Sequence, residues 1–135
     1  MRVILDTNVF ISAVFFGGPP NRILQGWRDG RVKLVLSPEI LDEYRRVAAE
    51  LKTQFPAVDL TAILELLMVA AEMHQAEPLP AAVCADPDDD KFLACALASG
   101  SRLIVSGDKH LLDVAGYHGI EILKPRPFVD KYLAD

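Results

Sequence analysis

The sequence predicts a three-layer α/β fold in which a mainly parallel, roughly five-stranded sheet is flanked by helices. Short apolar strands alternate with helical segments along the chain, a pattern typical of parallel strands joined by helical crossovers. The first strand, over residues 2–5, contains the unbroken apolar run Val3-Ile4-Leu5, as expected of a strand covered on both faces. At 135 residues the chain is long enough for a sizeable core but short for two domains, so we expect one domain over residues 1–135.

Capping residues and helix breakers place the elements of the first half. Asp6, Thr7 and Asn8 follow the first strand and offer capping side chains for a helix. Further along, Ser37 and Pro38 provide an N-cap serine and a proline at the first helical position. The expected elements are a strand over residues 2–5, helices over 9–16 and 21–29, a strand over 32–36, and helices over 38–51 and 59–72.

The second half is less regular. Residues 73–87 contain three prolines and leave room for one short strand. After them comes a helix that is apolar on all sides and stops at Gly100, which indicates a buried helix. The expected elements are this helix over residues 88–99, a strand over 102–106, a short helix over 109–114 and a last strand over 121–123.

Charge and cysteine content narrow the function classes. The net charge of −5 argues against binding nucleic acid through bulk positive charge, although it is compatible with a local basic patch. Cys84 and Cys95 form neither a CxxC pattern nor a zinc set, so we expect buried reduced thiols. We find no signal peptide and no apolar run of roughly 18 residues, which favours the cytoplasm. The candidate patch residues are Arg22, Arg28, Arg31, Lys33, Arg45, Arg46, Lys124 and Arg126.

Carboxylates stand where two apolar strands end. Asp6 follows the first strand directly, and Asp108 follows the strand that ends at Ser106, after one intervening glycine. In an open parallel sheet the ligand crevice lies outside the carboxyl ends of the strands, so we expect these two acids to converge. The alternative for each of them is a capping or turn role.

Helix phase selects two further acids. At about 100° per residue, Glu43 lies at the border of the inward stripe of its helix, whereas Asp42 lies nearly opposite that stripe. In the run Asp88-Asp89-Asp90, Asp89 lies above the bulkiest apolar face and is the first choice, with Asp90 and Asp88 in reserve. The alternative for this run is an acidic first turn that complements the helix dipole.

A cluster of four carboxylates needs a compensating charge. Two carboxylates about 5 Å apart repel by roughly 3 kcal/mol at an effective dielectric constant near 20, whereas a domain has a total stability of only about 5 to 15 kcal/mol. The cluster must therefore take up protons or cations, and oxygen-only ligands suit Mg²⁺ or Mn²⁺. The predicted chemistry is metal-assisted attack of water on a phosphodiester. The candidate catalytic and metal-binding residues are Asp6, Glu43, Asp89 and Asp108.

Three segments of the chain, together with Glu43, resemble a PIN domain. These segments cover residues 3–10, 86–93 and 106–112. The resemblance extends over almost the whole chain, and it is greatest to small bacterial PIN proteins related to the VapC-type toxins of toxin–antitoxin pairs. The order and spacing of the segments carry it more than any single segment does.

The resemblance implies a Mg²⁺- or Mn²⁺-dependent endoribonuclease on a Rossmann-like sheet, often a homodimer, which a partner antitoxin inhibits. It therefore implies an RNA substrate and an antitoxin protein as partners. His110 stands where relatives often carry a second acid, and Asp90 where many have asparagine. The resemblance maps the family's acids onto Asp6, Glu43, Asp89 and Asp108, and its neighbouring polar positions onto Asn8 and Ser106.

Other functions stand as alternatives. A PIN-like module could hold RNA or a protein without catalysis, and a processing nuclease could act outside any toxin–antitoxin pair. A phosphatase that uses Asp6 as a nucleophile is disfavoured, because Asn8 stands where such enzymes usually have a second aspartate. Lys91 and Lys109, beside the acids, are either phosphate contacts or ordinary solvated charges.

Overall fold

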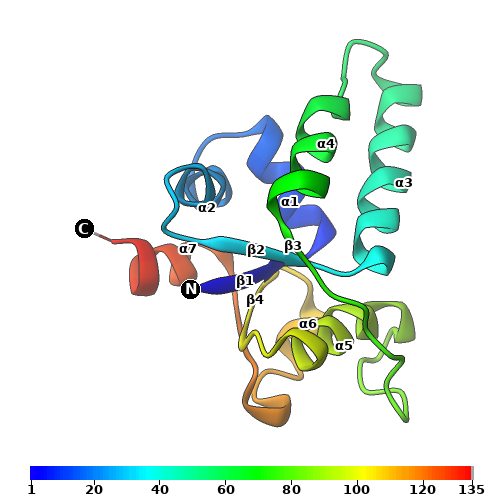
Figure 1. Ribbon diagram of the computed structural model, residues 1–135, viewed down its shortest axis with the longest axis vertical. Helices are drawn as coiled ribbons and strands as arrows, with labels where there is room; N and C mark the ends of the chain where they lie inside the picture. The colour runs from blue at the N-terminus through cyan, green and yellow to red at the C-terminus, as the bar shows by residue number, and fades with distance from the viewer. Residues whose placement is uncertain (135) are drawn as a thin grey trace.

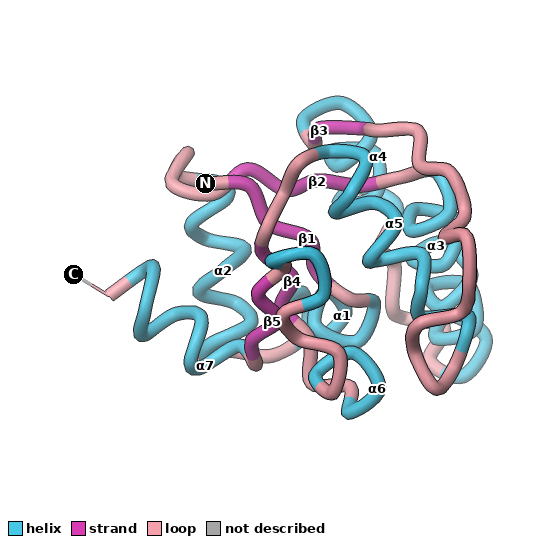
Figure 2. Tube along the Cα trace, turned by 90° about the horizontal axis from the view of Figure 1, so that it is seen from below, coloured by secondary structure: helices cyan, strands magenta, loops and turns pink. Residues whose placement is uncertain are grey.

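A parallel sheet forms the middle layer of the molecule. Its strands are β1 (Arg2–Leu5), β2 (Lys33–Leu36), β3 (Glu72–Met73), β4 (Leu103–Val105) and β5 (Glu121–Leu123). The computed structural model describes residues 1–134, and within them the five strands form one sheet in the order β3-β2-β1-β4-β5. Every neighbouring pair is parallel, and the strands can be followed in this order in Figure 2. The predicted parallel, five-stranded sheet is therefore confirmed.

Helices cover both faces of this sheet. They are α1 (Thr7–Phe15), α2 (Pro19–Arg28), α3 (Pro38–Gln54), α4 (Thr61–Ala70), α5 (Asp90–Ser99), α6 (Lys109–Leu112) and α7 (Pro125–Phe128). In Figure 1, α1 to α4 lie above the strands and α5 and α6 lie below them. The α7 helix packs against α2. This arrangement is the three-layer α/β fold that the sequence predicts.

The core fixes the carboxyl end of β1, where the first predicted acid follows. The apolar residues of β1 are almost completely buried, and so is Phe10 of α1. Phe10 stacks on Tyr44 of α3, with ring centroids 4.4 Å apart. The buried Tyr44 hydroxyl donates a hydrogen bond to the Leu5 carbonyl, because a buried hydroxyl group needs a partner. Both contacts fix α1 and α3 against the last residue of β1.

The end of α4 differs from the prediction. The helix expected over residues 59–72 ends at Ala70, and Glu72 instead belongs to β3. Glu72 accepts two hydrogen bonds from the Arg2 guanidinium, at 3.0 and 2.5 Å, and it pairs in register with Val35 of β2. These tertiary contacts override the local helical pattern. The one short strand that we expected within residues 73–87 therefore begins just before them.

The remaining helix and strand boundaries shift by a turn or less. The helix expected from residue 88 begins as a 3₁₀ turn (Pro87–Asp89), and α5 proper starts at Asp90. The α1 helix already starts at Thr7, because Asp6 alone caps it, and α3 continues to Gln54. The α6 helix ends at Leu112, short of the expected residue 114.

The C-terminal residues form elements that the sequence did not predict. The α7 helix begins at Pro125, where the fixed φ of proline suits a first helical turn. It continues into a wide π-type turn (Val129–Leu133). Phe128 and Leu133 are buried in the common core, and this last turn packs on α2. Burial of Phe128 and Leu133 therefore stabilises this C-terminal segment, which is too short for its sequence to show a helical period.

Two smaller predictions also concern the whole chain. Cys84 and Cys95 are buried free thiols, as expected. Within residues 1–134, no helix combines the length and the apolar character that crossing a membrane requires.

Candidate metal centre

Asp6 and Asp108 follow neighbouring strands at the carboxyl edge of the sheet. The strands pair directly, with Leu5 of β1 beside Val105 of β4. The buried Ser106 hydroxyl donates a hydrogen bond to the Asp6 carboxylate and accepts one from the Asp108 backbone N–H at 2.9 Å. Ser106, predicted as a supporting polar residue, therefore links the two acids.

Asp6 is a buried acid, with only 5% of its surface exposed. It caps α1 by accepting a hydrogen bond from the Val9 N–H at 3.0 Å. Burial is the main cause of a raised pKa at Asp6, and the negative charges of Asp108 and Glu43 raise it further. Hydrogen bonds from Ser106 and Val9 act in the opposite direction. Asp6 therefore caps α1 and also interacts electrostatically with two other predicted acids, Asp108 and Glu43.

Glu43 reaches the same edge from α3. Its carboxylate accepts a hydrogen bond from the Thr7 hydroxyl and forms an ion pair with the Lys91 ammonium, at 2.8 Å. The Glu43 side chain is only 13% exposed, which agrees with the border position that helix phase gives it. Thr7 is not among the predicted site residues, and its position directly after Asp6 is the only signal for it. Asn8, predicted as a supporting residue, is exposed on α1.

Asp89 carries a buried oxygen that lacks a hydrogen bond. Its Oδ2 atom is inaccessible to solvent and has no hydrogen-bond partner among the described residues. The His110 Nδ1 atom lies 3.5 Å from it. Burial raises the pKa of Asp89 to about 6, and the charges of Asp108 and Asp86 contribute to the rise. Such an oxygen is costly to bury unless a proton or a cation neutralises it.

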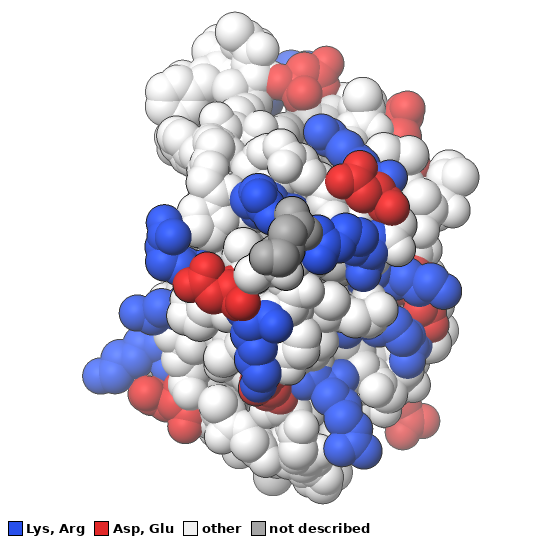
Figure 3. Space-filling model, turned by 90° about the vertical axis from the view of Figure 1, so that its left-hand side faces the viewer, with Lys and Arg blue, Asp and Glu red and all other residues white. Residues whose placement is uncertain are grey.

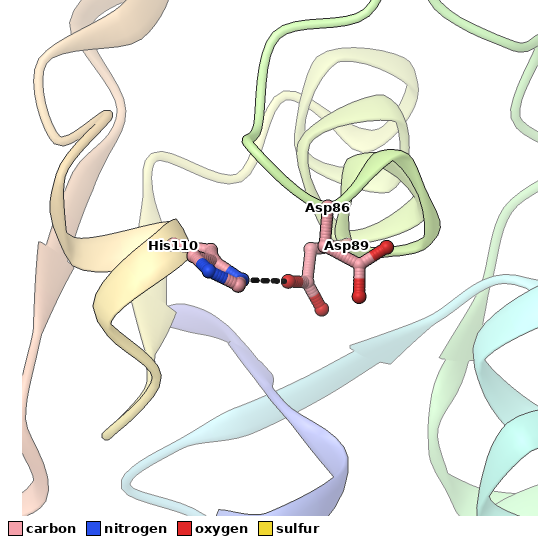
Figure 4. A group of neighbouring side chains, drawn as sticks. All are labelled: Asp86, Asp89 and His110. Atoms are coloured by element: carbon pink, nitrogen blue, oxygen red, sulfur yellow. Dashed lines mark ion pairs between the residues drawn. The ribbon is translucent and has the colours of Figure 1, made fainter.

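Asp86, Asp89 and His110 form a compact group of potential metal ligands. One ligand atom of each lies within 4.8 Å of the others. Figure 4 shows the His110 imidazole directed at the Asp89 carboxylate, with Asp86 beside it. Neither Asp86 nor His110 is among the predicted ligands. Asp86 caps the 3₁₀ turn (Pro87–Asp89) and Asp89 is its last residue, so the two are three positions apart on a helix with three residues per turn. The signal for His110 is its position two residues after Asp108.

The reserve candidates Asp88 and Asp90 are directed elsewhere. The Asp88 side chain is 61% exposed and pairs with a lysine at 3.1 Å. The Asp90 carboxylate turns back to the preceding loop, where it accepts hydrogen bonds from the backbone N–H groups of Val83 and Cys84 at 3.0 and 2.8 Å. Of the three consecutive aspartates, Asp89 is the one that presents a buried oxygen without a hydrogen bond.

The loop-holding role of Asp90 has a measurable consequence. Asp90→Ala is expected to lower the free energy of unfolding by about 2 kcal/mol, because two hydrogen bonds to a charged acceptor are lost. Asp88→Ala is the matched control, and its change should stay within about 0.5 kcal/mol because the side chain is exposed. Urea denaturation followed by circular dichroism measures both variants. Equal stabilities of the two would contradict this role.

The basic residues do not form one patch around the acids. On α3, Arg46 lies 3.6 Å from Glu43, and Arg45 lies 3.8 Å from Asp42. The other candidate patch residues lie on or beside α2, β2 and α7: Arg22, Arg28, Arg31, Lys33, Lys124 and Arg126. Figure 3 views the side of the molecule where α2 and α7 lie, and Lys and Arg side chains are spread over it. The expected basic patch is therefore divided between two parts of the molecule.

The chain is similar to known proteins along most of its length. A family model described as PIN domain matches residues 2–110. The chain is also similar to the uncharacterized protein MJ1680 of Methanocaldococcus jannaschii, with 28% identity over 144 residues that cover 98% of this chain and 92% of the relative. No solved structure matches the chain.

Proposed function

This chain belongs to the PIN domain family, and we propose that it is a metal-dependent endoribonuclease that hydrolyses phosphodiester bonds in RNA. PIN domains are generally metal-dependent nucleases, so the family supports a nuclease. The observation that carries the proposal is the group of acids at the carboxyl edge, in which Asp89 holds a buried oxygen without a hydrogen bond. A ligand crevice is expected at this edge of a parallel sheet.

The donor set fits a divalent cation. The buried Asp89 Oδ2 atom lacks a hydrogen bond, and one ligand atom from each of Asp86, Asp89 and His110 lies within 4.8 Å of the others. Asp108 lies near this group, because its charge raises the pKa of Asp89, and the same charge also raises the pKa of Asp6. Carboxylate oxygens favour Mg²⁺ or Mn²⁺, and an imidazole ligand favours a transition metal over Mg²⁺. When bound, such an ion lowers the pKa of a water molecule and neutralises the charge that develops on the phosphate.

The residues of the chain supply a preorganised frame for this chemistry. Ser106 holds the Asp6 carboxylate and the Asp108 backbone together, and Thr7 holds Glu43. Because the donors of these hydrogen bonds lie within three residues of the ends of β1 and β4, the acids are held close to the buried sheet. Sites whose side chains are fixed in this way need little reorganisation during the reaction.

We extend the proposal to the toxin of a type II toxin–antitoxin pair, acting in the cytoplasm as a homodimer that an antitoxin inhibits. The support is the resemblance to VapC-type proteins. An RNA-processing nuclease is the alternative, and the neighbouring gene discriminates between them. A short upstream reading frame for a DNA-binding protein, whose coexpression relieves growth arrest, would favour the toxin. Undisturbed growth on induction of an active nuclease would favour processing.

The proposed nuclease activity is tested by incubating the purified protein with RNA. We expect internal cuts in an end-labelled RNA pool with Mg²⁺ or Mn²⁺, loss of cutting with a chelator, and recovery when the ion is added back. DNA of the same sequence serves as the control substrate. Tight RNA binding without any cleavage, in the presence of either ion, would instead favour the non-catalytic binding module.

A further inference from the structure

Lys91 extends from the first turn of α5 into the group of acids. Its ammonium lies 2.8 Å from Glu43 Oε1 and 3.1 Å from Asp88 Oδ1. The lysine and glutamate side chains are only 17% and 13% exposed. Long lysine side chains on a surface usually keep their charged end in water. The ammonium of Lys91 is instead withdrawn from water and held by its two ion pairs.

The Glu43 carboxylate has a partner on each oxygen. Lys91 occupies Oε1, and the Thr7 hydroxyl donates to Oε2. Asp89 contrasts with it, because its Oδ2 atom is inaccessible to solvent and has no hydrogen bond within the described residues. The acids at this edge therefore form two unequal halves. The Glu43 half holds two cationic side chains, Lys91 at 2.8 Å and Arg46 at 3.6 Å, whereas the basic group beside Asp89 Oδ2 is the His110 imidazole, at 3.5 Å.

We propose that Lys91 is a positioning residue whose ammonium takes the place of a second metal ion, so that the centre binds a single divalent cation in the Asp89 half. This inference rests on the proposed function, since it presumes that the acids bind metal. Two-metal sites hold their ions about 3.5–4 Å apart, and an ammonium fixed on Glu43 would repel a second ion in that half. Loss of the ammonium would leave the part-buried Glu43 carboxylate with the Thr7 hydroxyl and the more distant Arg46 guanidinium, at 3.6 Å. A part-buried carboxylate that has lost its closest cation attracts another.

The test counts Mn²⁺ ions by calorimetry and by the electron paramagnetic resonance signal of the free ion. The wild type is expected to bind one Mn²⁺ per chain. Lys91→Met, which keeps the length of the side chain but removes its charge, is expected to bind two. Lys91→Arg should restore a single ion. Lys33→Met, an equal loss of charge at the amino end of β2, is the matched control and should also bind one.

A second readout is the dependence of the melting temperature on Mn²⁺. In Lys91→Met, Mn²⁺ should stabilise the fold over two binding steps. The second ion should bind at least about 100-fold more tightly than a second ion binds to the wild type, because one repelling charge is gone. Lys91→Gln serves the same purpose if the methionine variant does not fold without metal.

The outcomes separate the two proposals. One ion in both the wild type and the two neutral variants would overturn the role of Lys91 and leave the metal site standing. Two ions in the wild type would overturn it as well. Absence of Mn²⁺ binding in every variant would overturn the proposed metal-dependent function itself.

Discussion

Asp89→Asn is expected to reduce RNA cleavage by more than about 100-fold, exceeding the loss typical of a residue that only supports a metal ligand. The reason is local. Asp89 supplies a buried oxygen without a hydrogen bond, and an amide there brings no negative charge to hold a cation. The same substitution should remove Mn²⁺ binding, because Asp86 and His110 lose their central partner. The fold should persist, since the change relieves a buried charge rather than a packing contact.

The two neighbouring aspartates provide matched controls for this prediction. Asp88→Asn changes an exposed side chain, and Asp90→Asn keeps an oxygen that can accept from one of the two loop N–H groups that Asp90 holds. Both variants should bind Mn²⁺ and cleave RNA within about tenfold of the wild type, because neither carboxylate has an unpaired buried oxygen. Single-turnover cleavage and metal calorimetry on the same preparations measure the effects. A larger loss in Asp88→Asn or Asp90→Asn than in Asp89→Asn would assign the main ligand to a different aspartate.

The sequence could place some of these acids because their positions follow from backbone geometry. Asp6 comes directly after β1 and Asp108 follows β4 within three residues, and parallel strands end at one edge whatever the details of the loops. Glu43 follows from a regular helix with a clear inward face. In each case one periodicity, of a strand or of a helix, decides where the residue lies.

The sequence could not place Asp86 and His110, for a physical reason. Asp86 precedes a 3₁₀ turn rather than an α-helix, so its alignment with Asp89 follows a three-residue repeat that is too short to read. His110 lies in a helix of only four residues, whose direction depends on the packing of Leu111 in the core. Glu72 is a similar case, because its strand exists through contacts with β2 and Arg2, which no local pattern encodes.

Asp6 shows how a binding site conflicts with stability. Because its pKa is raised in the folded protein, the folded state holds a proton there more readily than the unfolded chain does. Ionisation of Asp6 at neutral pH therefore opposes folding in the absence of metal. A carboxylate that is unfavourable for the fold is understandable if it serves a bound cation, and this conflict leads to a prediction with opposite signs for stability and activity.

Asp6→Asn is expected to raise the free energy of unfolding of the metal-free protein by about 1 kcal/mol, the size of a partly screened repulsion between carboxylates. The asparagine oxygen can still accept the Val9 N–H, and its NH₂ group can donate to the Ser106 oxygen, so the cap of α1 is kept. Cleavage should nevertheless fall by more than about 100-fold. Urea denaturation with and without Mn²⁺, together with cleavage assays, measures both effects.

Ser106→Ala separates the charge of Asp6 from its hydrogen bonding. This variant keeps the buried carboxylate but removes the hydroxyl that donates to it. It should be less stable than the wild type without metal, by about 1 to 3 kcal/mol, because a buried acceptor loses its partner. Its response to Mn²⁺ should be larger, since a cation can then satisfy Asp6. If Asp6→Asn is also less stable than the wild type without metal, the prediction for Asp6 is wrong. The buried Asp6 carboxylate would then stabilise the fold rather than oppose it.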